Sequence, residues 1–140
     1  MIINCRNSKI IDNIYIHDSI FSGFSYNYKS REIFLECEQR YLNKRFRFLF
    51  HNVILCNMQS CSFWHGGNSI LDISLEESSS QMNELIEIQN QHKELYKGSY
   101  LDQGISYLQI KFEINSGDIL FIICESFDLE EEPYSRKRNF

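Results

Sequence analysis

Apolar residues recur at every second position along most of this chain, and this alternation is the pattern of half-buried β-strands. The clearest case is the run in which Phe46, Phe48 and Phe50 alternate with Arg45 and Arg47. The same period predicts further strands over residues 20–28, 33–37, 70–75 and 108–114. The chain is therefore predicted to fold mainly as antiparallel β-sheet.

Turn residues and one helical pattern separate these strands. Polar turns follow at 29–30 and 115–118, and the glycine pair at 66–67 marks a loop. Residues 78–97 are mostly polar with apolar residues at helical spacing, which predicts an inserted helix. The run 119–124 is apolar on both faces, as in a central strand.

These patterns predict an α+β fold, mainly β, with residues 1–140 forming a single domain. We expect an antiparallel sheet of about seven or eight strands, arranged as a sandwich or a partly open barrel, with one inserted helix. The strand at 46–50 is expected to continue through 53–55 past a bulge. Residues 133–140 begin at the only proline and are expected to form a flexible tail.

Cysteine usage and hydropathy indicate the compartment. The five cysteines have irregular spacing, and an odd count argues against a disulfide framework. The first residues lack the apolar core of a signal peptide, and no run approaches the length of a membrane span. We therefore predict a cytoplasmic protein without cofactor whose cysteines are small buried apolar residues.

Charge is sorted along the chain. Residues 72–132 hold 14 acidic side chains and three lysines, so this stretch carries −11. Residues 1–71 hold five acids and eight bases, and 133–140 add three bases, so each of these stretches carries +3 and the total is −5. An acidic surface repels nucleic acid and anionic membrane and attracts basic partners.

The acidic residues after the last apolar strand are the first candidate binding surface. Phe127, Leu129 and Tyr134 interleave with the acids of this segment. Apolar and aromatic anchors ringed by charge are typical of a specific protein interface, whereas a run of acids alone is typical of a solvated face. The expected contact residues are Glu125, Asp128, Glu130, Glu131, Glu132 and Tyr134.

A second acidic patch and one tryptophan complete the predicted partner-binding set. Asp72, Glu76 and Glu77 flank the strand expected at 70–75. Trp64 lies beside the glycine pair, where it either forms an exposed anchor or folds back over the core. Both features fit docking of a basic protein.

A small metal-binding protein or enzyme is the first alternative. Cys56, Cys61 and His65 could supply ligands, with His51 or Cys37 as the fourth. A structural zinc site normally shows two tight ligand pairs, and here only one loose pair is present, so no metal is predicted. His17, Asp18 and Ser19 have the residue types of a hydrolase triad, but adjacent residues cannot converge as a triad does.

A nucleic-acid-binding role is not expected. Arg40, Lys44, Arg45 and Arg47 form a basic stripe. Strand alternation places the neighbouring phenylalanines on the opposite face, whereas single-stranded nucleic acid is bound by cations and aromatics on one surface. The net charge also opposes binding to phosphates.

Three short motifs occur together in this chain: His17-Asp18-Ser19 followed by Tyr26, residues 50–53 with 68–73, and the turn at 114–119. In these motifs the chain resembles small β-rich bacterial proteins, several of which are similar to immunity proteins of toxin systems, including contact-dependent growth inhibition. The polar segment at 78–97 departs from the outline of those proteins.

The resemblance implies an immunity protein that binds a cognate toxin and needs no catalytic residues of its own. Many such toxins are basic nucleases, so an acidic surface that occludes the toxin's active site fits the charge map. The second alternative is a ligand-binding β-barrel whose many aromatic residues line a cavity.

Overall fold

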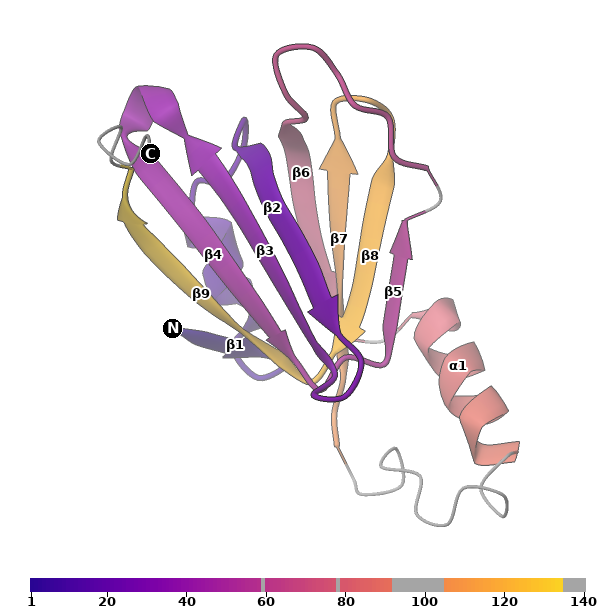
Figure 1. Ribbon diagram of the computed structural model, residues 1–140. Coiled ribbons are helices and arrows are strands. Elements are labelled where there is room, and N and C mark those ends of the chain that lie inside the picture. The colour runs from indigo at the N-terminus through magenta and orange to yellow at the C-terminus, as the bar shows by residue number, and fades with distance from the viewer. Residues whose placement is uncertain (59, 78, 92–104, 135–140) are drawn as a thin grey trace.

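The computed structural model describes residues 1–58, 60–77, 79–91 and 105–134. In these ranges, nine strands form two antiparallel sheets that face each other (Figure 1). Sheet A has the order β1-β9-β4-β3-β2, and sheet B has the order β5-β8-β7-β6. The predicted class, α+β and mainly β, is confirmed, and the arrangement is a sandwich rather than a closed barrel.

Sheet A is built from a three-stranded meander with two strands added from the ends of the chain. The β2–β3 hairpin matches the alternation predicted at 20–28 and 33–37, and its register shifts between Phe21 and Gly23, where Ser22 interrupts the alternation. β3 then pairs with β4. The strands of sheet A are β1 (Ile2–Asn4), β2 (Ile20–Asn27), β3 (Glu32–Gln39), β4 (Lys44–His51) and β9 (Ser126–Pro133).

Sheet B contains the second predicted hairpin. β8 lies between β5 and β7, and most of its residues are buried, as predicted for a central strand. Gly117 has a φ of +87° in the turn that joins β7 to β8, a conformation that L side chains rarely adopt. The strands of sheet B are β5 (Leu55–Met58), β6 (Ile70–Glu76), β7 (Leu108–Ile114) and β8 (Ile119–Cys124).

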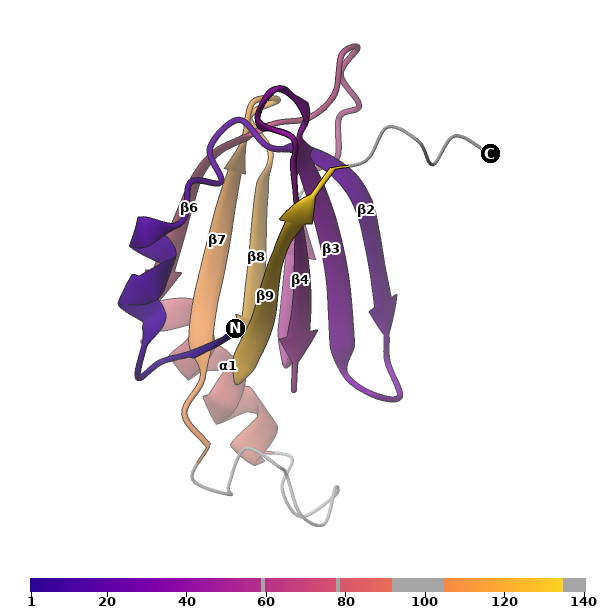
Figure 2. The same ribbon diagram turned by 90° about the vertical axis from the view of Figure 1, so that its left-hand side faces the viewer.

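The described helices lie outside both sheets. α1 (Ser80–Gln91) packs beside sheet B through Met82, which is buried with Tyr107 and Ile123. The Ser79 hydroxyl accepts a hydrogen bond of 3.1 Å from the Met82 amide, which is the N-terminal capping expected of a serine. The rest of the predicted helix, 92–97, lies outside the described residues. Two 3₁₀ helices, η1 (Ser8–Asn13) and η2 (Arg40–Leu42), complete the elements, and Figure 2 shows η1 beside β6.

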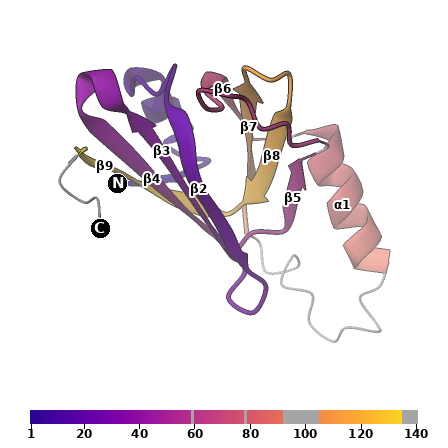
Figure 3. The ribbon, with the colours of Figure 1, turned by 45° about the horizontal axis from the view of Figure 1, so that its top comes forward.

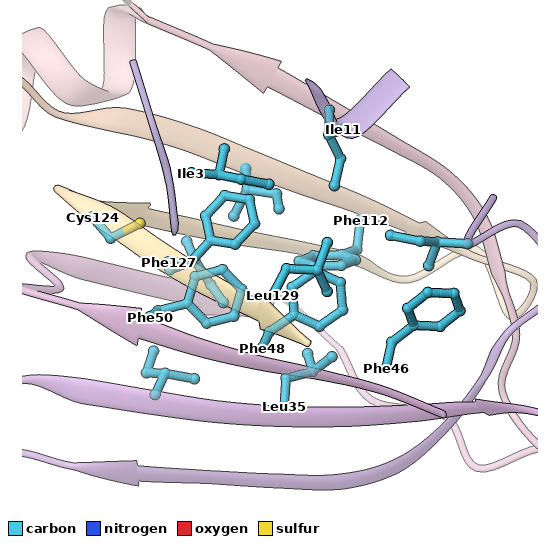
Figure 4. Close-up of a cluster of buried hydrophobic side chains, with 14 of the residues drawn as sticks. Ile3, Ile11, Leu35, Phe46, Phe48, Phe50, Phe112, Cys124, Phe127 and Leu129 are labelled. Atoms are coloured by element: carbon cyan, nitrogen blue, oxygen red, sulfur yellow. The ribbon is translucent and has the colours of Figure 1, made fainter. Parts of the chain in front are cut away.

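Phenylalanines fill the space between the sheets. Phe46, Phe48 and Phe50 project inward from β4, as their alternation predicts (Figure 4). The ring of Phe48 lies 5.7 Å from that of Phe112 on β7 and 5.9 Å from that of Phe127 on β9, which are normal packing distances for aromatic rings. The aromatic residues thus pack against one another, which counts against an interior ligand cavity.

The structure corrects the prediction for the acidic end of the chain. Ser126–Pro133 is not a charged surface segment but strand β9, which lies between β1 and β4 in sheet A. Phe127 and Leu129 are buried in the core and are not available as anchors for a partner. The amide of Tyr134 donates to the carbonyl of Asn43 at 2.9 Å, so the predicted tail does not begin at Pro133. Residues 135–140 lie outside the described part of the chain.

The prediction that one strand runs from 46 through 55 is also wrong. β4 ends at His51, and Asn52 adopts a left-handed conformation with a φ of +51°. The chain then crosses to sheet B, where the amide of Ile54 donates to the carbonyl of Ile123 at 2.9 Å. The apparent break in the period therefore marks a change of sheet.

Candidate partner-binding surfaces

No described helix covers the outer face of sheet A (Figures 1 and 3). The strand registers place charged residues on this face. Because side chains alternate along a strand, the neighbours of the buried phenylalanines on β4 face outward. Register places Arg47 directly opposite Glu36 on one side and Glu130 on the other. We call this surface the charged face; its members are Glu32, Glu36, Glu38, Arg45, Arg47, Asp128, Glu130 and Glu132.

Arg45 is the buried centre of an ion-pair network on the charged face. Its guanidinium nitrogens lie 3.6 Å from Glu36, 3.8 Å from Glu38 and 3.4 Å from Glu132. Arg47 joins the same network, with distances of 3.1 Å to Glu36 and 3.2 Å to Glu132. The arginine pair thus holds carboxylates from two different strands in fixed positions.

This network corrects the interpretation of the predicted acidic surface. Glu132 binds Arg45 and Arg47, and Glu131 lies 3.1 Å from the Lys44 ammonium. Asp128 accepts a hydrogen bond of 2.9 Å from the amino group of Met1. The basic stripe and the acidic segment, which the sequence presents as separate features, therefore neutralise much of each other's charge.

Glu130 is the carboxylate of this segment that remains most available. Its side chain is exposed and has no cationic partner among the described residues. Glu125 is half-buried immediately before β9. The Tyr134 ring lies 5.7 Å from the Arg40 guanidinium carbon and 5.4 Å from that of Arg45, so it packs against the network rather than projecting freely.

The second predicted acidic patch lies on the other sheet. Asp72 and Glu76 are exposed on β6, where their register partners are Glu113 and Gln109. Glu77 accepts a hydrogen bond of 3.5 Å from the Ser8 hydroxyl. The structure therefore does not bring the two predicted patches together into one interface.

Exposed aromatic residues gather near β2 and β5, which are the edge strands of the two sheets on this side of the sandwich. The sequence patterns did not predict this concentration. Phe24 is 45% exposed, Tyr26 60%, Phe63 89% and Trp64 50%. Phe24 and Tyr26 are opposite the buried Leu35 and Ile33 in the β2–β3 register, so they share the inward face of sheet A. The alternation of Phe24 and Tyr26 along the strand predicts that they share one face. The sequence does not show that sheet B leaves this end of β2 uncovered.

A groove runs along this edge of the sandwich. It has a volume of about 510 Å³ and is lined by residues of both sheets, among them Phe24, Leu35, Met58, Phe63 and Leu120. An adjoining groove of about 450 Å³ continues past Tyr26 and Tyr28 to Ile54 and Leu55. We call the two together the edge groove.

Asp118 fixes the loop that borders the edge groove. Its carboxylate accepts hydrogen bonds from the Ser60 hydroxyl, from the Ser62 amide at 2.8 Å and from the Ser116 hydroxyl at 2.8 Å. These bonds, that of Ser60 first, lower the pKa of Asp118 below its ordinary value because they stabilise the ionised form. The loop that carries Phe63 and Trp64 is thereby anchored to the β7–β8 turn.

The residues proposed for metal binding or catalysis do not converge. Among the described residues, no group of three or more His, Cys, Asp or Glu side chains is placed to hold a metal ion. Cys56 and Cys61 line the edge groove, but the alternative ligands lie elsewhere: His51 pairs with Glu32 at 3.2 Å and Cys37 is buried in the core. His65 is exposed on its loop.

The segment His17-Asp18-Ser19 is a turn that joins the two sheets. The Asp18 amide donates to the Ile70 carbonyl at 2.8 Å, and the Ile70 amide donates to the Ser19 carbonyl at 2.8 Å. Asp18 has a φ of +66°, and the Nδ1 atom of His17 lies 2.5 Å from the Leu71 carbonyl oxygen. These contacts form a structural connection between β2 and β6.

Neither a scan of protein-family models nor a search of curated proteins finds a match to this chain. No helix in the described ranges is long and apolar enough to cross a membrane. The function must therefore be argued from the surfaces described above, because a fold alone does not define an activity.

Proposed function

We propose that this chain is an immunity protein of the cytoplasm that binds a cognate basic toxin, a nuclease, and occludes its active site. The observation that carries the proposal is the charged face: an uncovered sheet surface on which carboxylates outnumber guanidinium groups. Such a face attracts a positively charged protein and can occupy the site of a phosphate substrate.

The rigidity of the charged face supports tight binding. Arg45 and Arg47 hold Glu36 and Glu132 in place before any partner arrives. A surface that is already ordered loses little side-chain entropy on association, so more of the interaction energy appears as affinity. Glu130 is the exposed carboxylate beside this ordered network and is the expected first contact.

The dispersed cysteines and histidines favour this proposal over the metal-binding or enzymatic alternative. Cys56 and Cys61 border the edge groove, whereas His17 lies at the turn between β2 and β6. The candidate ligands and catalytic groups named from the sequence therefore do not meet at one site, and the described residues contain no group of three or more His, Cys, Asp or Glu side chains placed to hold a metal ion. A binding role requires only a stable surface of suitable shape and charge.

Charge reversal on opposite sheets tests the proposal. The partner is the toxin domain encoded beside the gene for this chain, and the association rate is measured over a range of salt concentrations. Glu130→Lys is expected to slow association about tenfold at low salt, with a smaller effect at high salt. Asp72→Lys, an equal charge change on the exposed face of β6, is the matched control and is expected to have little effect.

Equal effects of the two substitutions would show that net charge alone matters and would overturn the assignment of the charged face. Failure of the toxin domain to bind the unaltered chain would overturn the immunity role itself. Circular dichroism of each variant distinguishes a lost contact from a lost fold.

A further inference from the structure

Among the described residues, β2 is an edge strand that is protected against pairing only at its start, where the register shifts between Phe21 and Gly23 and Ile20 bridges to Ser69. It is the last strand of sheet A, and no residue from Ile20 to Tyr28 is charged. Natural edge strands are normally blunted by charged residues, by proline or by a covering element. The Phe21 amide donates to Asn68 at 2.9 Å, and among the described residues no further backbone bond reaches the free edge of β2.

The opposite wall of the edge groove repeats these properties. β5 is the last strand of sheet B, and residues 52–64 contain no Asp, Glu, Lys or Arg. The edge groove is therefore bordered by two uncharged strand edges, although charged residues make up 24% of the chain. Three charged residues, Arg31, Glu32 and Asp118, also line the edge groove, but none of them belongs to β2 or β5. Along the two strands themselves, an ionised side chain would lose its hydration without gaining a partner.

The floor of the edge groove is core rather than surface. Leu35 and Leu120 line it and are fully buried, whereas Phe24 and Phe63 at its rim are largely exposed. The inward face of β2 thus continues the core outward without a sheet B strand to cover it. An apolar occupant of the groove would therefore cover the exposed rings of Phe24 and Phe63.

We propose that the edge groove accepts an extended strand of another polypeptide with one apolar face, which adds to β2 as a further strand of sheet A. The incoming backbone would pair with the free edge of β2, and every second side chain, apolar in character, would enter the groove. The backbone of β2 selects a strand over a small apolar molecule, because only another backbone satisfies a row of amides and carbonyls. This site lies apart from the charged face and does not depend on the proposed immunity role.

A synthetic peptide tests this site directly. The probe is a capped peptide of about ten residues in which valine and threonine alternate, long enough to cover β2. The control peptide has the same sequence except for two central prolines, which cannot donate backbone hydrogen bonds. We expect saturable binding of the alternating peptide, with slowed amide hydrogen exchange in β2, and no binding of the proline peptide.

Two substitutions on the same strand separate the groove from the strand's other face. Phe24→Lys places a charge in the edge groove and is expected to weaken peptide binding about tenfold or more. Ser25→Lys introduces the same side chain at the neighbouring exposed position, which is opposite Phe34 in the register and faces away from the groove. This control variant is expected to bind as the unaltered chain does.

Three results would overturn the proposal. The first is no saturable binding of the alternating peptide, and the second is equal binding of the proline peptide, which would indicate apolar adhesion only. The third is protection of β2 that rises with protein concentration in the absence of peptide, which would assign the edge to a second copy of this chain. None of these results affects the outcome of the Glu130→Lys experiment.

Discussion

Arg45 on β4 and Glu132 on β9 lie directly opposite each other in the antiparallel register, with the Arg45 Nη1 and Glu132 Oε1 atoms 3.4 Å apart. The two residues are 87 positions apart in the sequence. Their pairing connects the meander of sheet A to a strand made much later in the chain. The pairing also shows that Glu132, part of the acidic segment, contributes to holding the strands of sheet A together.

Replacement of Arg45 by methionine is expected to lower the free energy of unfolding by about 2–3 kcal/mol. The side chain of Arg45 is 9% exposed, so its loss leaves Glu36, Glu38 and Glu132 close together without their shared cation. Arg47→Met is the control, because that side chain is 34% exposed and water can replace more of its contacts. Denaturant titration of both variants checks this prediction, and an equal loss in the two would contradict it.

Asp118 is expected to make the protein sensitive to acid. Its pKa is lowered in the folded chain, so its hydrogen bonds stabilise the fold above the ordinary carboxyl pKa of 3.8. This stabilisation is lost as the pH falls below that value toward the lowered pKa. Asp118→Asn should therefore reduce stability at pH near 7 and flatten the acid limb of the stability curve. Thermal unfolding over a pH series measures both, and an unchanged acid limb would show that another group dominates.

Gly67→Ala is expected to destabilise the fold by about 1–3 kcal/mol. Gly67 has a φ of +103°, and an added Cβ atom would lie 2.6 Å from Cγ2 of Ile20. Gly66 has a similar φ of +91° but open space around the Cβ position, so Gly66→Ala isolates the backbone strain. Denaturant unfolding should show the larger loss for Gly67→Ala. A similar loss in both variants would mean that Ile20 moves aside without cost.

The five cysteines are expected to differ in their reaction with a thiol reagent. Burial raises the pKa of Cys37 to about 12 and raises that of Cys124 as well. Because the thiolate is the reactive form, these two should react at pH 8 only after the chain unfolds. Cys56 and Cys61 are both exposed, so the prediction that the cysteines are buried is wrong for these two. Partial desolvation of the Cys56 thiol raises its pKa, so Cys61 should react before Cys56. Mass spectrometry of labelled peptides gives the order, and early labelling of Cys37 would contradict the packing of the core.

Local patterns were sufficient for the hairpins of this fold. Leu35 and Phe48 are in register across β3 and β4, as their alternation with charged residues implies. β9 was missed, although Phe127 and Leu129 alternate with acids in the same way. The run from Glu130 to Glu132 obscured that alternation. Glu131 pairs with Lys44, and Glu132 pairs with Arg45 and Arg47, and these partners are distant in the sequence. Pairing between distant strands is not encoded in any local period.

The candidate surfaces were predictable only in part. Glu130 is exposed as predicted, but the sequence could not show that Glu131 and Glu132 have cationic partners on β4. The edge groove depends on how far sheet B extends over Phe24 and Tyr26. That extent is a property of how two sheets pack, so strand alternation alone could not predict it.

The position of β9 between β1 and β4 has a consequence for how the protein is made. As a nascent chain leaves the ribosome, β2, β3 and β4 emerge long before residues 126–133, so β4 must wait with one edge unpaired and its phenylalanines uncovered. A translating chain in this state is prone to aggregate or to engage chaperones. Folding yield should therefore depend on how quickly translation delivers β9, because sheet A is complete only after that strand emerges.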